Sequence, residues 1–289
     1  MIKIHSIQGT RRIAIIVPTL SATGSLFEQF MDSLSKTTEQ KPTVISVESH
    51  GPEFNYAKSI NAGIHEAMTH NPDFLILSND DIVFFNGWLD SLLSCFDVFQ
   101  KLGYVIPSCS TAKGDLIPTL VKRPSWPAIH MYVSLQSIIP FIFSDSVARS
   151  VGRVQNLISN RVAIQDRIGS HFSFTGYGLS ANSAPLCVLP TSVFDRIGLF
   201  DELFQVGGED LDFTIRTYLS GYQVALDIKS KIHHLASASI NKTGGYYRSR
   251  YVRDRAVKNW RRILQKYTPQ QYAAFLRACA TQTVTIHSS

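Results

Sequence analysis

Residues 13–34 read IAIIVPTLSATGSLFEQFMDSL and predict a buried strand followed by a helix. Ile13 to Val17 form an uninterrupted apolar run rich in β-branched side chains, and Pro18 ends it. From Ser25 onward, apolar residues recur at the three- and four-residue spacing of an amphipathic helix. This strand–helix unit is the building block of α/β folds.

The same unit repeats along the first hundred residues. The short apolar run 43–47 precedes helical spacing over 56–68, and the run 73–77 precedes helical spacing over 88–96. A fourth strand is expected to start at 104–106. Parallel neighbours need crossovers, and continuous apolar strands need cover on both faces. The pattern therefore predicts an α/β fold with a doubly wound, mostly parallel sheet, whose ligands bind beyond the carboxyl ends of the strands.

The alternation of strands and helices is lost from Lys113 to about Asn182, a stretch that contains several prolines and isolated aromatic residues. We interpret it as an insertion over the sheet and a candidate acceptor region. The regular pattern returns with a short strand at 184–190, a helix that opens near Glu209 and a strand at 223–228. These segments complete a catalytic domain that we expect to span residues 1–245.

The remaining residues, 246–289, form a basic helical extension, with Pro269 in the first turn of a last helix. The chain carries a net charge of +6, yet between Tyr246 and Lys266 eight Lys or Arg residues face only Asp254. Apolar residues recur at about every fourth position, so the segment predicts a basic amphipathic helix. Three interpretations stay open: a helix packed on the domain, attachment to an anionic membrane, and nucleic-acid binding, which no motif supports.

Composition suggests where the protein works. The chain has 289 residues with 44% hydrophobic content, enough for one large buried core. No apolar stretch reaches the roughly 18 residues of a spanning helix, and the first apolar run is too short for a signal peptide. We expect a cytoplasmic protein, with peripheral contact at the inner face of the membrane as an option. The cysteines lie far apart and are expected to be small buried hydrophobes: Cys95, Cys109, Cys187 and Cys279.

Asn79-Asp80-Asp81 is the polar exit of the predicted strand 73–77. At this position, one carboxylate could face a ribose and the other a metal ion. A divalent cation held there would neutralise a diphosphate leaving group. The same pair could instead cap a turn or the next helix.

A second acidic cluster opens the predicted helix near residue 209, where Gly207-Gly208-Glu209-Asp210 is followed by Asp212. Carboxylates at a helix start are commonly caps that the helix dipole stabilises, which suits at least one of these three. A sugar acceptor hydroxyl, however, needs a general base, and the two glycines allow a substrate to approach closely. A cap and a base can coexist in this cluster.

His233-His234 follows the predicted strand 223–228 after a short Lys-Ser-Lys turn. A single histidine is usually structural, whereas a pair at a strand exit could supply one imidazole to a metal ion. An imidazole beside a carboxylate would mildly favour Mn²⁺ over Mg²⁺.

Taken in order, four segments resemble the inverting family-2 glycosyltransferases of GT-A fold, particularly the branch with rhamnosyl- and galactofuranosyltransferase-like members. The resemblance covers roughly residues 13–107 and 184–234. The segments are IAIIVPTL (13–20), FNYAKSINAGIHEA (54–67), FLILSNDDIVFFNGWLDSLL (74–93) and PTSVFDRIGLFDELFQVGGEDLDFTIRTYLSGYQVALDIKSKIHH (190–234).

The resemblance implies a role for each matching position. The nucleotide base would lie against Pro18, Thr19 and Glu48, where Glu48 replaces an aspartate that is common in the family. Positions near the diphosphate would be Phe54, Asn55, Lys58 and Asn61, and Asp80 would bind the donor from the aspartate motif. The metal, Mn²⁺ or Mg²⁺, would be held by Asp81 and His234 within an Asn-Asp-Asp version of the family's DXD motif. The Glu209–Asp210 pair would be catalytic, with Asp210 as the base.

The resulting hypothesis is a metal-dependent, inverting, hexosyltransferase-like enzyme of glycan or polysaccharide biosynthesis. Its donor would be linked to UDP, dTDP or GDP, and its acceptor would be a glycan, a lipid-linked molecule or a protein. A nucleotidyltransferase is the closest enzymatic alternative, but it would need a glycine-rich phosphate loop, of which 21–25 is only a faint version. A non-catalytic carbohydrate or membrane adaptor is the other alternative, and the presence of both Asp81 and Asp210 argues against it.

Overall fold

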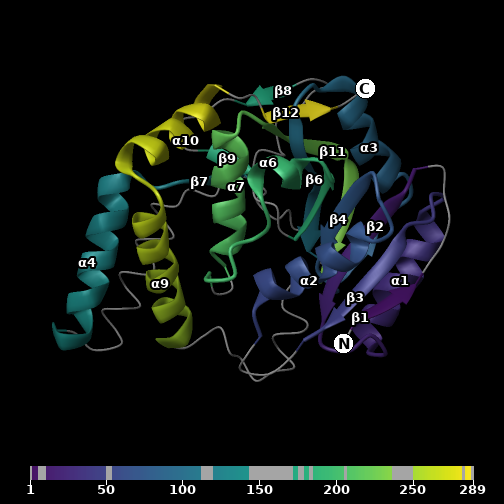
Figure 1. The fold of residues 1–289 in the computed structure, drawn as a ribbon, viewed down its shortest axis with the longest axis horizontal. Helices are drawn as coiled ribbons and strands as arrows, with labels where there is room; N and C mark the ends of the chain where they lie inside the picture. Colours follow the sequence, from purple (N-terminus) through teal and green to yellow (C-terminus); the bar gives the residue numbers. More distant parts are fainter. Residues whose placement is uncertain are drawn as a thin grey trace.

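The computed structural model is a mixed α/β fold built around one large sheet (Figure 1). It describes residues 2–5, 11–49, 54–111, 120–142, 172–174, 179–181, 185–204, 207–235, 250–281 and 284–287. The predicted insertion is thus described only in part. The predicted domain boundary at residue 245 lies outside the described residues.

The first half of the chain alternates strands and helices, as its apolar pattern predicts. Helix α2 has the predicted bounds, while α1 and α3 extend slightly beyond the predicted ranges. The elements are β1 (Ile2–His5), β2 (Ile13–Thr19), α1 (Ser25–Thr37), β3 (Thr43–Glu48), α2 (Tyr56–Met68), β4 (Phe74–Ser78), β5 (Ile82–Phe84), α3 (Trp88–Val98) and β6 (Leu102–Thr111).

The second half adds strands on both sides of β6 and a group of helices. Strand β11 extends six residues beyond its predicted end at 228 and so carries both histidines within the sheet. The elements are β7 (Leu120–Lys122), α4 (Trp126–Ile142), β8 (Phe172–Phe174), β9 (Leu179–Ala181), β10 (Leu186–Pro190), α6 (Val193–Ile197), α7 (Glu209–Leu219), β11 (Gln223–His234), α9 (Arg250–Lys266), α10 (Pro269–Thr281) and β12 (Val284–His287).

The large sheet has the strand order β1-β3-β2-β4-β10-β6-β11-β12-β8, and β5 pairs with β11. Strands β3, β2 and β4 are parallel, as are β6, β11 and β12. Strand β10 lies between the two parallel groups and is antiparallel to both β4 and β6. The carboxyl ends of β2, β4 and β11 carry the residues described below.

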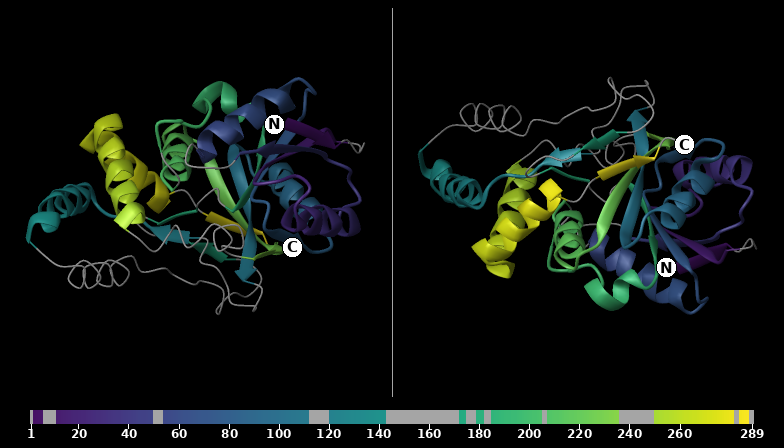
Figure 2. Two further views of the ribbon diagram at one scale, coloured as in Figure 1. Left: turned by 90° about the horizontal axis from the view of Figure 1, so that it is seen from below. Right: turned by 90° about the horizontal axis from the view of Figure 1, so that it is seen from above.

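Helices cover both faces of the sheet, so the predicted doubly wound architecture is confirmed (Figures 1 and 2). Strand β2 shows why. Ala14 and Ile16 belong to the hydrophobic cluster that contains α2 and α7, whereas Ile13, Ile15 and Val17 belong to the cluster that contains α1 and α3. Successive side chains of a strand point to opposite faces, so a strand that is apolar at every position must be covered twice.

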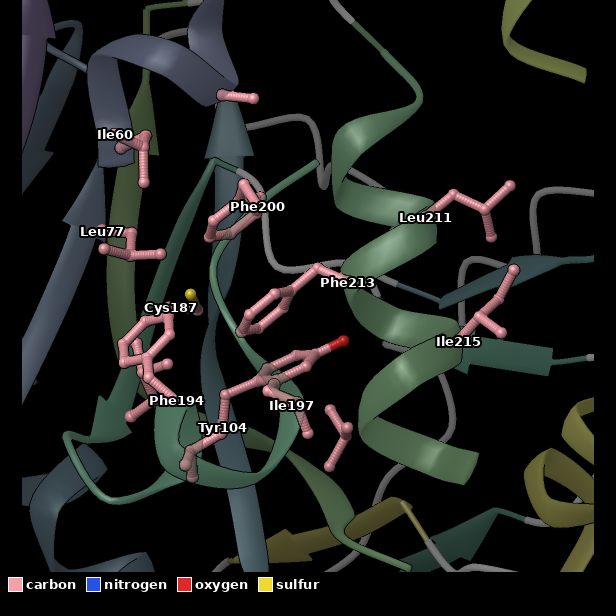
Figure 3. Packing of buried hydrophobic residues seen from close by; sticks show 14 of the residues in the cluster. Ile60, Leu77, Tyr104, Cys187, Phe194, Ile197, Phe200, Leu211, Phe213 and Ile215 are labelled. Carbon is pink, nitrogen blue, oxygen red and sulfur yellow. The ribbon is translucent and has the colours of Figure 1, made fainter. Parts of the chain in front are cut away.

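The cluster on the α7 side is rich in aromatic side chains (Figure 3). Phe200 and Phe213 stack with ring centroids 4.4 Å apart, and Phe194 and Tyr104 lie beside Phe213. Burial of this many large rings is a major source of folding free energy. All four cysteines are buried and unbridged, as predicted.

Within the predicted insertion, residues 126–142 form a helix, α4, which the sequence did not predict. Its residues are apolar on all sides, so helical periodicity is not visible in the sequence. Helix α4 lies beside α9 (Figure 1), and its first turn packs into the core through Ile129, while Met131 and Leu135 are exposed. Among the described residues, no helix has the length and apolar character needed to cross a membrane.

The two C-terminal helices pack on the domain, which is one of the three interpretations of the basic segment. Val257 and Ile263 of α9 and Tyr267 just beyond it are buried. Arg262 and Lys266 form ion pairs with Asp201, at 3.4 and 2.7 Å. Part of the positive charge of the segment thus neutralises a carboxylate of the fold.

Candidate active site

The carboxyl ends of β2 and β4 bring the first acidic pair to the same edge of the sheet. Thr19 Oγ1, at the end of β2, donates a hydrogen bond of 2.8 Å to Asp80 Oδ2, and both side chains are buried. The backbone N–H of Leu235, just beyond β11, donates to the carbonyl of Asp81 at 2.9 Å. The turn after β4 is therefore fixed on both sides by neighbouring strands.

Asp81 and His234 face each other across this edge. Asp81 Oδ1 lies 3.0 Å from His234 Nε2, yet this oxygen is buried and has no hydrogen-bond partner among the described residues. Asn79 Nδ2 lies 3.5 Å from the same nitrogen. The distance of 3.0 Å equals the separation of two neighbouring ligands held at about 2.1 Å and 90° around a hard divalent ion.

The carboxylate and the imidazole thus fit a shared cation, with an unpartnered buried oxygen as the strongest sign. Among the described residues, no three His, Cys, Asp or Glu side chains converge on one point. An ion at this position would take two protein ligands and fill its shell with oxygens from a diphosphate and water.

His233 behaves differently from its neighbour, because adjacent residues of a strand point to opposite faces. Its Nδ1 is hydrogen-bonded to Ser110 Oγ, and its ring meets the edge of Phe85 at 4.6 Å between centroids. Of the two adjacent histidines, only His234 reaches Asp81.

Glu48 ties the end of β3 to the loop that follows β2. Its Oε1 accepts hydrogen bonds from the Ala22 N–H at 2.9 Å and from Lys3 Nζ at 3.0 Å. These two bonds, the backbone one first, hold the pKa of Glu48 below its usual value. Pro18 and Thr19 lie buried at the end of β2, beside this loop.

Two of the residues predicted to lie near the diphosphate, Asn55 and Asn61, make hydrogen bonds to other parts of the protein. Asn55 caps α2 by accepting the Lys58 N–H at 3.0 Å, and its amide donates to the Glu202 carbonyl at 2.8 Å. Asn61 is buried and exchanges hydrogen bonds with the backbone of Phe200 at 2.9 and 3.0 Å. Lys58 is exposed. The amides hold α2 against the segment before α7, and contact with a diphosphate stays a prediction for all three residues.

Helix α7 begins with Glu209 and Asp210, whose carboxylates have different surroundings. Glu209 is 5% exposed, and its Oε2 accepts the N–H groups of Gly207 and Gly208 at 2.8 and 2.9 Å. Burial, and then the charge of Asp210, raise the pKa of Glu209 from 4.5 to about 7. Glu209 is the cap of this cluster and holds a proton more readily than an ordinary carboxyl group.

Asp210 is more accessible and lines a pocket of about 160 Å³ between α7 and α9. Its Oδ1 accepts the Leu211 N–H at 2.7 Å. The described residues place no hydrogen-bond donor on Oδ2. One oxygen is therefore held by the helix start, while the other is available to a molecule in the pocket.

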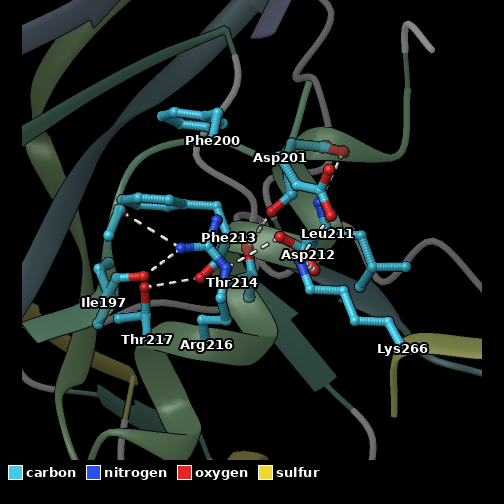
Figure 4. Close-up of polar contacts among 12 residues, drawn as sticks. Ile197, Phe200, Asp201, Leu211, Asp212, Phe213, Thr214, Arg216, Thr217 and Lys266 are labelled. Carbon is cyan, nitrogen blue, oxygen red and sulfur yellow. Dashed lines mark hydrogen bonds and ion pairs between the residues drawn. The ribbon is translucent and has the colours of Figure 1, made fainter. Parts of the chain in front are cut away.

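Asp212 is the third carboxylate of the cluster, and it is fully buried (Figure 4). Its Oδ2 accepts from Arg216 Nε at 2.9 Å, and its Oδ1 pairs with Lys266 Nζ at 2.8 Å. The hydroxyl of Tyr267 also donates to Oδ1, at 2.7 Å. Lys266 and Tyr267 lie at and just beyond the end of α9, so Asp212 locks α9 against α7.

Tyr56, the first residue of α2, is a site residue that the sequence analysis did not single out. Burial raises the pKa of its phenol well above the usual value, and the charges of Glu209, Asp210 and Asp81 add to this rise. Because carboxylates from both acidic clusters act on one phenol, the exit of β4 and the start of α7 both lie near Tyr56. Its neighbour Asn55, within the Phe-Asn stretch of the resemblance, was the available signal.

No model of a known protein family matches the chain, and no curated protein matches it in sequence. Among solved structures, it is similar to the mannosyltransferase PcManGT from Pyrobaculum calidifontis in complex with GDP-Man and Mn²⁺. The identity is 15%, the match covers 94% of this chain and 70% of that one, and the TM-score is 0.46.

Two other similar structures are also glycosyltransferases. The catalytic domain of Drosophila β1,4-galactosyltransferase 7 with xylobiose is 15% identical, with 75% of this chain and 65% of that one covered and a TM-score of 0.41. GalNAc-T7 with UDP, GalNAc and Mn²⁺ is 11% identical, with 78% and 44% covered and a TM-score of 0.48. The chain thus spans less than two thirds of these two proteins. Likeness at this level does not bear on function, which must come from the site residues.

Proposed function

We propose that this protein is a glycosyltransferase that moves a sugar from a nucleoside diphosphate to an acceptor hydroxyl with inversion. One observation supports the proposal: a carboxylate–imidazole pair suited to a cation, Asp81 and His234, and a carboxylate that opens into a pocket, Asp210, belong to the two acidic clusters that flank Tyr56. Transfer between a charged leaving group and a neutral hydroxyl needs these two elements, one at each end of the reacting bond.

On the donor side, Asp81 and His234 would hold a divalent ion, Mn²⁺ or Mg²⁺. When bound, the ion neutralises charge on the diphosphate and makes it a better leaving group. Asp80, which the Thr19 hydroxyl orients, is suited to a ribose hydroxyl, and Glu48 to the nucleotide base. Lys58, exposed on the first turn of α2, is suited to a phosphate oxygen.

On the acceptor side, Asp210 takes the proton of the attacking hydroxyl as its oxygen bonds to the anomeric carbon. The bond from that carbon to the phosphate oxygen breaks, and its electron pair leaves with the nucleoside diphosphate. Attack from the opposite face inverts the anomeric centre. Glu209 is unsuited to this task because its carboxyl group is buried and accepts the Gly207 and Gly208 N–H groups before the helix. Asp210 is therefore the base of the pair.

Binding of nucleoside diphosphates tests the donor half of the proposal. We expect calorimetry to give an affinity for UDP or GDP that falls at least tenfold when Mn²⁺ is removed with a chelator. His234→Gln should remove most of this metal dependence, while His233→Gln is the matched control from the opposite face of β11. Equal affinity with and without Mn²⁺ in the unaltered protein would remove the metal from the mechanism.

A further inference from the structure

The pocket between α7 and α9 has walls of three chemical kinds. The start of α7 contributes Asp210, helix α9 contributes the aromatic ring of Trp260 and the amide of Asn259, and the segment between β7 and α4 contributes the guanidinium of Arg123. Its volume of about 160 Å³ is small beside the clefts of about 300 Å³ or more that enclose drug-sized ligands, so it suits about one sugar ring.

The wall that α9 provides is fixed in place. Asp212 binds Lys266 and Tyr267, which anchors the C-terminal end of α9 to α7. At the pocket itself, Gly208 touches Asn259 so closely that a Cβ on Gly208 would lie 2.6 Å from Asn259 Cγ. Trp260 and Asp210 therefore keep a set separation, as preorganised binding of a rigid ring requires.

Each wall suits a different part of a saccharide. The half-buried indole of Trp260 offers an apolar face for the C–H side of a sugar ring. Asp210 suits a hydroxyl through its outer oxygen. Arg123 gives the pocket a permanent positive charge, which favours an anionic group on the ligand.

We infer that this pocket binds the acceptor and that the unit which enters it is an anionic sugar, such as a uronate or a sugar phosphate. The inference rests on the proposed function, because it takes Asp210 as the base. It selects a saccharide acceptor over a bare lipid alcohol or a protein hydroxyl. The anionic group of the sugar lies at Arg123 and its reacting hydroxyl lies at Asp210, so a single sugar unit contacts both charged residues of the pocket.

Saturation-transfer NMR with small sugars tests this specificity. The probes are the methyl glycosides of glucuronic and galacturonic acid, glucose 6-phosphate, and the neutral methyl glucoside and galactoside. We expect at least one anionic sugar to bind at least tenfold more tightly than its neutral counterpart. Arg123→Gln should remove this preference and Arg123→Lys should keep part of it, whereas Lys258→Gln, on the exposed side of α9, should not change it. Trp260→Phe should weaken the binding of anionic and neutral sugars alike.

Three results would overturn the inference: equal binding of neutral and anionic sugars, no binding of any anionic probe at millimolar concentration, or a preference that persists in Arg123→Gln. Thermal unfolding of each variant checks that it is folded. Calorimetry with UDP and Mn²⁺ on the same samples reports the donor site separately. If the nucleotide binds and the anionic sugars do not, the acceptor inference fails while the proposed function stands.

Discussion

The two acidic clusters contain the same functional group and use it differently. At the exit of β4, Asp80 accepts the hydroxyl of Thr19, and the buried oxygen Oδ1 of Asp81 faces the imidazole of His234 at 3.0 Å without accepting a hydrogen bond. At the start of α7, the three carboxylates of one helical turn have different surroundings. Glu209 accepts the Gly208 N–H, Asp210 opens into a pocket, and Asp212 pairs with two cations. The role of a carboxylate is thus set by what surrounds it.

The two clusters also differ in where their partners come from. The strand-exit cluster is completed by residues of β2 and β11, which the sheet brings to one edge. The helix-start cluster is completed by the last turn of α9, more than fifty residues further along the chain. Each substitution within the helix-start cluster is therefore expected to change a different property: the rate of catalysis at Asp210, the free energy of unfolding at Asp212, and its pH dependence at Glu209.

The largest effect is expected at Asp210. Asp210→Asn should lower kcat by two to four orders of magnitude and leave nucleoside diphosphate affinity unchanged, because loss of a general base typically costs about 10²–10⁴-fold. Glu209→Gln is the matched control, since its amide oxygen can still accept the Gly207 and Gly208 N–H groups. Steady-state kinetics with a nucleotide-sugar that the unaltered protein uses as donor would check this. An inactive Glu209→Gln beside an active Asp210→Asn would show that Glu209, and not Asp210, is the base.

The next effect concerns stability at Asp212. Asp212→Asn should lower the free energy of unfolding by about 3–5 kcal/mol, because it removes the carboxylate that compensates the largely buried Arg216, whereas Lys266 keeps its ion pair with Asp201. Asp32→Asn is the matched control. Asp32 and Lys36 form an ion pair with the same i,i+4 spacing, but their side chains are 60% and 69% exposed, so little change is expected.

Urea unfolding of both variants measures the difference between the buried and the exposed pair. Equal losses at Asp212 and Asp32 would show that burial of Asp212 does not amplify its contribution. A stable Asp212→Asn would also mean that α9 is held by its apolar contacts alone.

The smallest effect is a change in pH dependence at Glu209. Its pKa is about 4.5 in the unfolded chain and about 7 in the folded one, so its contribution to stability is fully present below pH 4.5. Between these values the folded state binds more protons than the unfolded state, and stability falls as pH rises. The expected loss is on the order of 3 kcal/mol by pH 8.

Glu209→Gln should remove this loss, so its unfolding free energy should exceed that of the unaltered protein increasingly from pH 5 to pH 8. Chemical unfolding at several pH values measures it. A constant difference between the two proteins across this range would mean that Glu209 ionises as an exposed glutamate does.

Several conclusions drawn from the sequence stay predictions. Inversion, the nucleotide base and the identity of the metal all require a bound donor. Membrane contact through the basic helix is another. Among the described side chains of α9, the exposed basic ones are Lys258 and Arg261, whereas Arg262 and Lys266 pair with Asp201. The cytoplasmic location and the role of the 113–182 insertion, which is described only in part, stay predictions as well.

The sequence by itself determined the architecture around the strand exits. Ile13 to Val17 could only be a strand covered on both faces, and the spacing over 56–68 could only be a helix, because burial imposes these periodicities locally. The polar residues that end such strands, Asp80 and Asp81, could therefore be placed at the edge of the sheet from the sequence. His234 could be placed there as well, although β11 is longer than its apolar pattern.

Only the tertiary structure decided the roles at the start of α7. Apart from the resemblance, the residue pattern did not distinguish a cap from a base among Glu209, Asp210 and Asp212. Packing of α9 gave Asp212 its ion pair with Lys266 and Asp210 its pocket wall, and burial raised the pKa of Glu209. The free energy of a charge depends on the solvent and the partners around it in space, and an order of residues along a chain does not specify them.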